Sequence, residues 1–259
     1  MPLEGKTGEL TGVEVSEHVL LKTRTGLTLA ENAKPFLDWL EQWYAKLKPL
    51  SLDAVITDPE RVAITSVDLI NGFCYEGNLS SPRVAALGPK VVDLFQRAHM
   101  RGVRNFVLIQ ECHSEHAEEF KAYGPHGICG TRETETVAAL ASLPFANQFS
   151  IVRKNSLHTI TDTAMEQWLE RHTDVDTFIV VGDCTDLCAY DLAMDLKLRA
   201  NARDIARRVI VPENCAQTYD LTVDDAEKIG ALPHDGDFLH RLFLYMMALN
   251  KIEVVKALV

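Results

Sequence analysis

From residue 61 onward, short runs of apolar and β-branched residues alternate with longer segments in which apolar residues recur at helical spacing. The runs that predict strands cover residues 62–68, 103–110, 148–152, 177–181 and 207–211. The segments that predict helices cover residues 82–100, 133–143, 161–172, 186–203 and 222–231. This alternation predicts an α/β fold, with a doubly wound, mostly parallel sheet that carries helices on both faces.

The first sixty residues do not follow this alternation. Apolar residues recur there at helical spacing, at Phe36, Leu37, Leu40, Trp43, Tyr44 and Leu47. Their stripe predicts one amphipathic helix that packs on the domain or on a neighbouring subunit. We therefore expect an N-terminal helical extension over residues 1–60 and a single α/β domain over residues 61–259.

Composition narrows the classes of function. The chain has 259 residues and 47% hydrophobic residues, which is enough to bury one large core. Its net charge of -11 argues against a nucleic-acid partner, because affinity for phosphate backbones comes from clustered Lys and Arg. The first twenty residues lack the apolar block of a secretory signal, and no stretch is apolar enough to span a bilayer. We expect a cytoplasmic protein without a membrane partner.

Six cysteines are too few for a disulfide scaffold at this length. In a reducing compartment they are expected to remain thiols. Cys74, Cys129 and Cys215 are expected to be small, buried core residues.

Candidate chemistry follows from the predicted strand ends, because open parallel sheets bind ligands beyond the carboxyl ends of their strands. The positions that follow the first four strands are Asp68, residues 111–113, Lys154 and residues 182–188. Cys188 lies where the fourth strand breaks at glycine and a helix begins, a place where the helix dipole favours thiolate and free N–H groups can hold an oxyanion.

Each of these residues also has a plain structural interpretation. Cys188 could be an ordinary core cysteine, Asp68 a turn or helix cap and Lys154 a solvated surface charge. A carboxylate at the end of a buried strand needs a partner, however, and a lysine near both a carboxylate and a thiol can support an ion triad.

Three ordered segments resemble the signature regions of the isochorismatase-like cysteine hydrolases. They are residues 67–74 (VDLINGFC), Lys154 and residues 182–188 (GDCTDLC), and the similarity extends over roughly residues 60 to 250. The resemblance implies a catalytic triad of Asp68, Lys154 and Cys188. It also implies an oxyanion hole made by the backbone N–H groups of Cys184 and Cys188.

A narrower resemblance is to nicotinamidases, in particular those of the plant-type branch. It rests on residues 71–79, 125–131, 215–221 and 244–248. It implies hydrolysis of nicotinamide to nicotinate and ammonia through a cysteine thioester, which is a step of NAD salvage. Phe73 and Tyr123 match the aromatic residues that surround the substrate ring in those enzymes.

The same resemblance implies a divalent metal ion bound by Glu111, His113 and His126, with Glu119 as a possible further ligand. Oxygen and nitrogen donors of this kind suit zinc, and manganese or iron as alternatives. Without the resemblance, these histidines would be ordinary members of a polar loop. Two positions depart from the family pattern: Glu111 replaces an aspartate, and Asp183 replaces an apolar residue beside an expected cis peptide.

The expected partner is a small amide, and we expect a homo-oligomer. Alternatives are another small-amide hydrolase or an isochorismatase-type hydrolase of the same superfamily, or a non-catalytic binding protein on the same fold. The intact triad argues against the binding protein. Four other histidines are expected to be structural or surface residues: His158, His172, His234 and His240.

Overall fold

The computed structural model describes residues 26–259. The chain divides into two compact units, Met1–Trp39 and Leu40–Val259. Helix α1 (Leu29–Ala45) confirms the predicted N-terminal helix, and it begins with a capping box in which Thr28 and Glu31 exchange backbone and side-chain hydrogen bonds. The division expected near residue 60 stays a prediction, and residues 1–25 of that extension lie outside the described residues.

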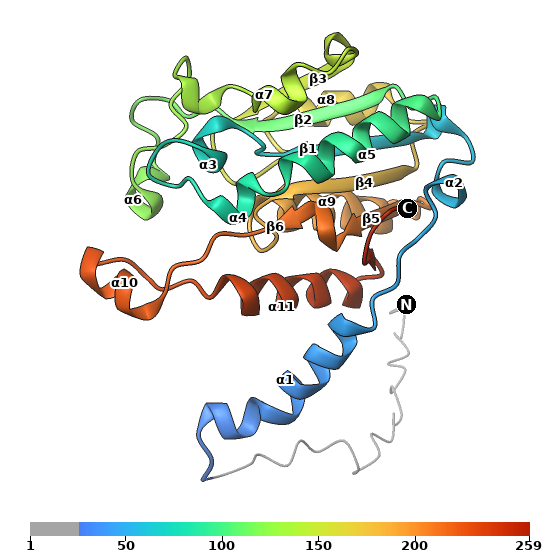
Figure 1. Ribbon diagram of the computed structural model, residues 1–259. Helices are drawn as coiled ribbons and strands as arrows, with labels where there is room; N and C mark the ends of the chain where they lie inside the picture. Colours follow the sequence, from blue (N-terminus) through green and yellow to red (C-terminus); the bar gives the residue numbers. More distant parts are fainter. Residues whose placement is uncertain (1–25) are drawn as a thin grey trace, which may run out of the picture. The chain divides into compact units, whose positions relative to one another are not determined.

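A single parallel sheet forms the centre of the larger unit (Figure 1). Its strand order is β3-β2-β1-β4-β5-β7, and β6 pairs with β4. The strands are β1 (Val62–Val67), β2 (Asn105–Glu111), β3 (Phe149–Lys154), β4 (Thr177–Asp183), β5 (Arg208–Pro212), β6 (Ala216–Gln217) and β7 (Glu253–Val255). The order reverses at β1, so the chain winds outward in both directions, as the doubly wound prediction requires.

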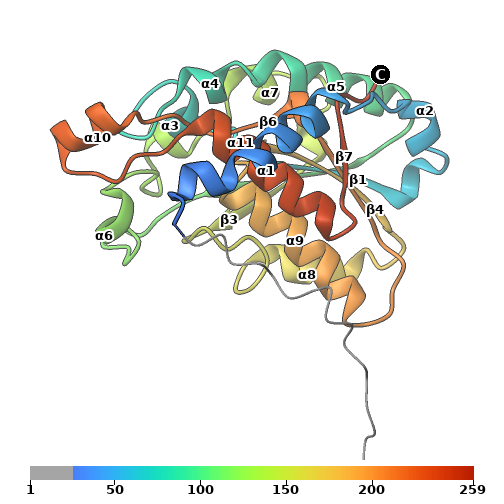
Figure 2. The ribbon, with the colours of Figure 1, turned by 90° about the horizontal axis from the view of Figure 1, so that it is seen from below.

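Helices cover both faces of this sheet, as predicted (Figure 2). They are α2 (Leu52–Val55), α3 (Asn71–Cys74), α4 (Pro82–Ala85), α5 (Gly88–Met100), α6 (Phe120–Tyr123), α7 (Ala138–Ala141), α8 (Ala164–Arg171), α9 (Cys188–Asn201), α10 (Val223–Ile229) and α11 (Gly236–Leu249). Single 3-10 turns cover Pro59–Arg61, Arg132–Thr134, Ala146–Gln148 and Glu213–Cys215.

Two predicted helices differ in extent from the structure. The segment 82–100 is divided into α4 and α5, because Pro89 fits the first turn of a helix but would break its interior. The segment 133–143 is mostly extended or turn, and only its end forms α7. Thr136 forms an antiparallel bridge with Ile70, and this pairing keeps the backbone extended despite the helical spacing of the apolar residues.

Each face of the sheet has its own hydrophobic core. On one face, α5 packs Leu94 and Phe95 against Ile64 of β1. On the other, α9 packs Leu192 against Ala63 of the same strand. Every residue of β1 is buried, which is typical of a parallel strand covered on both sides.

The sequence patterns did not predict α11 and β7. Helix α11 adds Leu244 and Met247 to the second core, and β7 extends the sheet by pairing Val254 with Val211. The segment of α11 is apolar on most of its faces, so it lacks the polar positions that mark an amphipathic helix. The strand β7 has only three residues.

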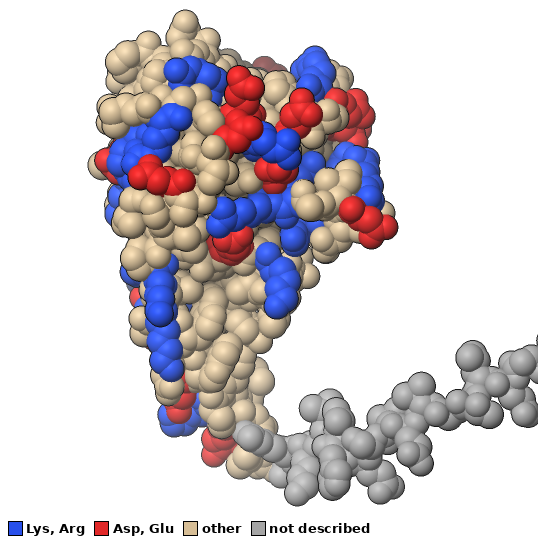
Figure 3. Space-filling view, turned by 90° about the vertical axis from the view of Figure 1, so that its right-hand side faces the viewer, with Lys and Arg blue, Asp and Glu red and all other residues tan. Residues whose placement is uncertain are grey.

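Within residues 26–259, no helix combines the length and the apolar character that a bilayer span requires. On the face shown in Figure 3, Lys and Arg side chains are interspersed with Asp and Glu. Ion pairs also join the amino ends of strands: Arg61 bonds Asp176 before β4, and Arg208 of β5 bonds Glu253 of β7.

Candidate active site

Four ionisable side chains meet at the carboxyl edge of the sheet. Asp68 follows β1, Glu111 ends β2, Lys154 ends β3, and Cys188 begins α9 after β4. Strand register aligns them, because Glu111 pairs with Lys154 across β2 and β3. All four side chains are buried, with Asp68 1% and Cys188 4% exposed.

The ammonium group of Lys154 is the centre of this cluster. Its Nζ lies 2.9 Å from Asp68 Oδ2, 2.8 Å from Glu111 Oε1 and 3.4 Å from Cys188 Sγ. The other oxygen of Asp68 accepts a hydrogen bond of 2.8 Å from the Glu111 backbone N–H. The three residues of the predicted triad are therefore adjacent, and Glu111 is a fourth member that the sequence assigned only to the metal.

Burial controls the protonation of this cluster. It raises the pKa of Asp68 to about 6, against the opposing charge of Lys154. Burial also raises the pKa of the Cys188 thiol, again opposed by Lys154. Although burial disfavours its charge, the negative groups around Lys154 hold the pKa of that ammonium above its usual range. The resting site is thus a thiol beside a carboxylate that is able to take a proton near neutral pH.

The turn before Cys188 requires a glycine. Gly182 has φ +112°, and a Cβ there would lie 2.1 Å from the backbone oxygen of Val67 in β1. The following peptide, Asp183–Cys184, is cis, as the resemblance led us to expect. Cys188 is the first residue of α9, so its backbone N–H lies in the first helical turn, where N–H groups lack intrahelical acceptors.

Asp183, the family departure beside this peptide, is 1% exposed. Burial raises the pKa of its carboxyl well above the usual range, which favours the uncharged form. In that form it adds no second anion beside the Cys188 thiol.

The predicted metal ligands form a compact cluster. Oε2 of Glu111 lies 3.0 Å from His126 Nε2 and 3.2 Å from His113 Nε2, and the two Nε2 atoms are 3.2 Å apart. His126 Nδ1 is 2.8 Å from the Gly124 carbonyl, which leaves Nε2 as the ligand atom. Glu119 Oε2 is 3.9 Å from His113 Nε2. One oxygen and two nitrogen donors converge on one point, so these residues fit a divalent ion.

Glu111 belongs to both clusters at once. Its longer side chain directs Oε1 to Lys154 and Oε2 to the two histidines. The extra methylene relative to aspartate therefore does not remove the carboxylate from the metal cluster.

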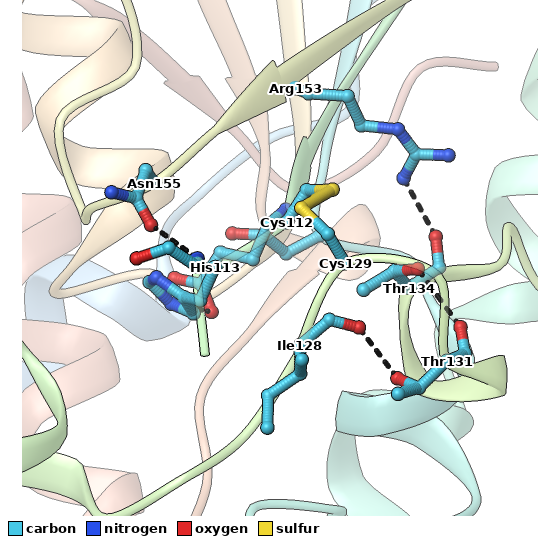
Figure 4. Close-up of a disulfide and its surroundings, with 11 residues drawn as sticks. Cys112, His113, Ile128, Cys129, Thr131, Thr134, Arg153 and Asn155 are labelled. Atoms are coloured by element: carbon cyan, nitrogen blue, oxygen red, sulfur yellow. Dashed lines mark hydrogen bonds and ion pairs between the residues drawn. A yellow bond between two sulfur atoms is a disulfide. The ribbon is translucent and has the colours of Figure 1, made fainter. Parts of the chain in front are cut away.

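The structure corrects the expectation for Cys129. It forms a disulfide with Cys112, which lies between Glu111 and His113, and the two Cα atoms are 4.5 Å apart (Figure 4). The proximity arises because His113 pairs with Ile128: the N–H of His113 bonds to Gly127, and that of Cys129 bonds to His113. The two cysteines are 17 residues apart, so no local pattern indicated that they pair. The other two cysteines expected in the core, Cys74 and Cys215, are buried thiols.

Aromatic rings surround the predicted metal ligands. The ring centroids of Phe73 and Tyr123, the predicted pocket residues, lie 5.9 Å and 6.3 Å from that of His126. Phe120 adds a ring that lies 5.3 Å from His113 and that the sequence did not single out.

Two histidines assigned to structural or surface roles lie against the turn that leads to Cys188. His234 is 2.7 Å from Asp186, and His240 is 2.8 Å from Thr185. Both are buried, so neither is a surface residue. Sequence offered no signal for them, since both lie in segments without a catalytic motif.

Comparison with known proteins agrees with this geometry. The Isochorismatase domain family matches residues 62–230. Nicotinamidase 1 of Arabidopsis thaliana is 26% identical over 216 residues, which cover 78% of this chain and 88% of that protein.

Solved structures share the fold. A cysteine hydrolase from Pseudomonas syringae superposes with a TM-score of 0.64 at 21% identity, covering 81% of this chain and 92% of that one. A nicotinamidase from Bacillus subtilis has a TM-score of 0.60 at 19% identity, covering 75% and 99%. The N-carbamoylsarcosine amidase of Thermoplasma acidophilum has a TM-score of 0.57 at 18% identity, covering 76% and 96%. With a family match over most of its sheet and this arrangement at the sheet edge, the chain belongs to the isochorismatase family of hydrolases.

Proposed function

We propose that this protein is a cysteine amidase that hydrolyses nicotinamide to nicotinate and ammonia. The observation that carries the proposal is the shared carboxylate of Glu111, which joins the Asp68–Lys154–Cys188 cluster to the Glu111–His113–His126 cluster. This shared contact supports the proposal, because the proposed nucleophile and the proposed site for a ring nitrogen then lie side by side. The similarity to the Arabidopsis nicotinamidase supports the same substrate.

The reaction begins when Asp68 takes the proton of Cys188 while Lys154 holds both groups in place. The thiolate attacks the carboxamide carbon, and the carbonyl π electrons move to oxygen. Backbone N–H groups of Cys184 and Cys188 hold that oxyanion; loss of one such donor in other enzymes lowers the rate by about 10²–10³. The oxyanion then collapses, the C–N bond breaks, and Asp68 gives its proton to the leaving nitrogen, which departs as ammonia. A water gives one proton to Asp68 while its oxygen attacks the thioester carbon. The C–S bond then breaks, nicotinate leaves, and Asp68 returns the proton to the Cys188 thiolate.

Glu111, His113 and His126 would hold a divalent metal, with Glu119 close enough to assist. When bound, such an ion supplies a Lewis-acid site for a ring nitrogen; zinc suits these donors, and manganese or iron are alternatives. Phe73 and Tyr123 would enclose the ring. Holding the ring orients the carboxamide toward Cys188, which is a proximity effect.

Ammonia release from a panel of amides tests this function directly. The panel contains nicotinamide, benzamide as its carbocyclic counterpart, and aliphatic amides, with the Cys188→Ala protein as control. Nicotinamide should be turned over with the highest kcat/KM. Turnover of the aliphatic amides alone would contradict the substrate assignment.

A second candidate is an amidase for a non-aromatic small amide. The fold shared with N-carbamoylsarcosine amidase favours it, together with the replacement of the family aspartate by Glu111. An N-carbamoyl amino acid in the panel distinguishes the two. An isochorismatase-type reaction or a purely binding role lacks a specific observation in its favour. The cytoplasmic location, the place in NAD salvage and the homo-oligomer stay predictions.

A further inference from the structure

The nucleophile turn, residues 184–188, is held from outside the region that matches the family. That match ends at residue 230, whereas His234 and His240 lie beyond it, before and within α11. Each of these histidines contacts a different residue of the turn, Asp186 and Thr185 respectively. The proposed reaction does not use either side chain.

His234 holds Asp186 through its Nε2. The distance to Asp186 Oδ2 is 2.7 Å, and the two side chains are 10% and 5% exposed. On its other side, His234 Nδ1 is 3.0 Å from the Tyr219 carbonyl, and its ring stacks on that of Tyr219 with centroids 3.8 Å apart. These contacts leave the imidazole one orientation, with Nε2 toward the turn.

His240 holds Thr185 through the opposite nitrogen. Its Nδ1 lies 2.8 Å from the Thr185 hydroxyl oxygen, and its Nε2 lies 3.8 Å from the Glu213 carboxylate. The carboxylate favours a proton on Nε2, so Nδ1 accepts the hydrogen bond from the hydroxyl. Glu213 is itself held by Tyr44 and by Lys256 Nζ at 2.8 Å.

We propose that His234 and His240 are positioning residues that clamp the nucleophile turn and so fix the N–H groups of Cys184 and Cys188 toward the oxyanion. The inference rests on the proposed cysteine chemistry. Both restraints fall between these two N–H donors in sequence. The backbone N–H of Thr185 adds a third restraint by bonding to Gln217 at 3.0 Å.

An oxyanion hole depends on geometry within a fraction of an ångström, so a loosened turn lowers kcat without removing a substrate contact. A displacement of about 1 Å caused from a distance can cost about 10²-fold in rate. A residue that only packs the fold would change stability instead.

The two histidines use different nitrogens, and this allows matched amide substitutions. Glutamine places its terminal amide near the Nε2 position and asparagine near the Nδ1 position. His234→Gln and His240→Asn should therefore retain the clamp, while the exchanged pair, His234→Asn and His240→Gln, should lose it. His234→Leu and His240→Leu remove the hydrogen bonds, and His172→Leu on α8 is the control.

For each variant, kcat and KM for nicotinamide are measured with the melting temperature. The leucine and exchanged variants should lose up to about 10²-fold in kcat with little change in KM. The retaining variants should approach the parent, and the control should match it. If the glutamine and asparagine variants have equal kcat at position 234 and also at position 240, the proposal that these histidines position the turn is overturned. That comparison holds even if the leucine variants fail to fold.

Affinity for pyridine-3-carbaldehyde provides a reading that does not depend on amide hydrolysis. The Cys188 thiolate adds to the aldehyde carbon, the π electrons move to oxygen, and nothing leaves, so the adduct places an oxyanion in the hole. Loss of affinity should follow loss of kcat across the series. If the unsubstituted protein binds the aldehyde but releases no ammonia, the proposed function is refuted. The aldehyde affinities of the His234 and His240 variants then still decide whether these residues position the turn. No adduct in the parent, or equal affinity throughout, refutes the clamp.

Discussion

At the scale of single residues, Lys154 is the centre of the site because it is fully buried and its ammonium contacts two carboxylates and a thiol. A buried cation of this kind is retained only where its partners are fixed around it. In the proposed reaction, Cys188 is the nucleophile, Asp68 is the base, and the charge of Lys154 holds the cluster together.

The first prediction concerns the nucleophile. Cys188→Ala should abolish ammonia release and leave the melting temperature close to that of the parent, because the change removes one sulfur atom and no charge pair. Cys215→Ala, which removes a buried thiol of the other core, is the matched control and should stay active. Residual turnover by the Cys188 variant would show that another group attacks the substrate.

The second prediction concerns the two charged partners. Asp68→Asn and Lys154→Ala should each remove most activity, and the double variant should lose little more, because groups that act as one unit fail together. Lys154→Ala should also lower the free energy of unfolding by about 3–5 kcal/mol, since it leaves buried carboxylates without their cation. A double-mutant cycle of kcat/KM measures the coupling. Losses that multiply would mean that one residue serves only the structure.

The third prediction is an acid limb in the pH profile. Asp68 must be ionised to accept the Cys188 proton, and burial raises its pKa to about 6, so kcat/KM should fall as the pH drops through about 6. Stability should depend on pH in the opposite direction. Because the pKa of Asp68 is higher in the folded chain than in the unfolded chain, the free energy of unfolding should decrease as pH rises from 3.8 to about 6. Profiles of the parent that stay flat from pH 5 to 8 would contradict the assignment of Asp68 as base.

At the scale of elements, the end of β2 and the loop after it act together. The pairing of His113 with Ile128 and the disulfide between Cys112 and Cys129 hold the loop that carries His126 against the strand that carries Glu111. The predicted metal ligands are thus supplied by two segments joined at two points.

The fourth prediction follows from this arrangement. Metal analysis of protein purified without chelator should give about one ion per chain, and His126→Ala should lose it because one of three convergent donors is removed. His158→Ala is the control, since that ring bonds Asp191 and lies outside the cluster. Nicotinamide KM should rise in the His126 variant. Full metal content after the substitution would exclude His126 as a ligand.

At the scale of the larger unit, the segment after residue 230 completes both the core and the site. Leu244 and Met247 of α11 are fully buried, Ile252 and Leu258 are nearly so, and β7 covers the edge of β5. The family match alone therefore does not define the folding unit.

The fifth prediction tests that statement. A chain ending at residue 230 should lack the cooperative thermal transition of the full chain, because its second core loses one covering helix and its sheet loses an edge strand. Circular dichroism during heating makes the comparison, with a chain beginning at residue 26 as the control for truncation itself. A cooperative transition at a similar temperature in the shortened chain would show that α11 is an accessory.

The fold and the triad could be predicted from the sequence because both depend on local order. Alternating strand and helix patterns set the parallel sheet, and residues that directly follow strands, such as Asp68 and Lys154, necessarily gather at its carboxyl edge. The cis peptide before Cys184 and the candidate metal ligands Glu111, His113 and His126 were expected only from the resemblance to known enzymes.

Only the tertiary structure decided the contacts between segments far apart in the chain. The disulfide of Cys129, the second contact of Glu111 with Lys154, and the placement of His234 and His240 on the nucleophile turn depend on which segments pack together. A sequence pattern reflects only residues that are near one another in the chain. The partner of a side chain in a buried site depends instead on strand register and helix packing across the whole sheet. The order of residues along the chain was thus enough to predict the fold and to propose the site residues, because both depend on local patterns and motifs. How those groups are held together depends on packing between distant segments.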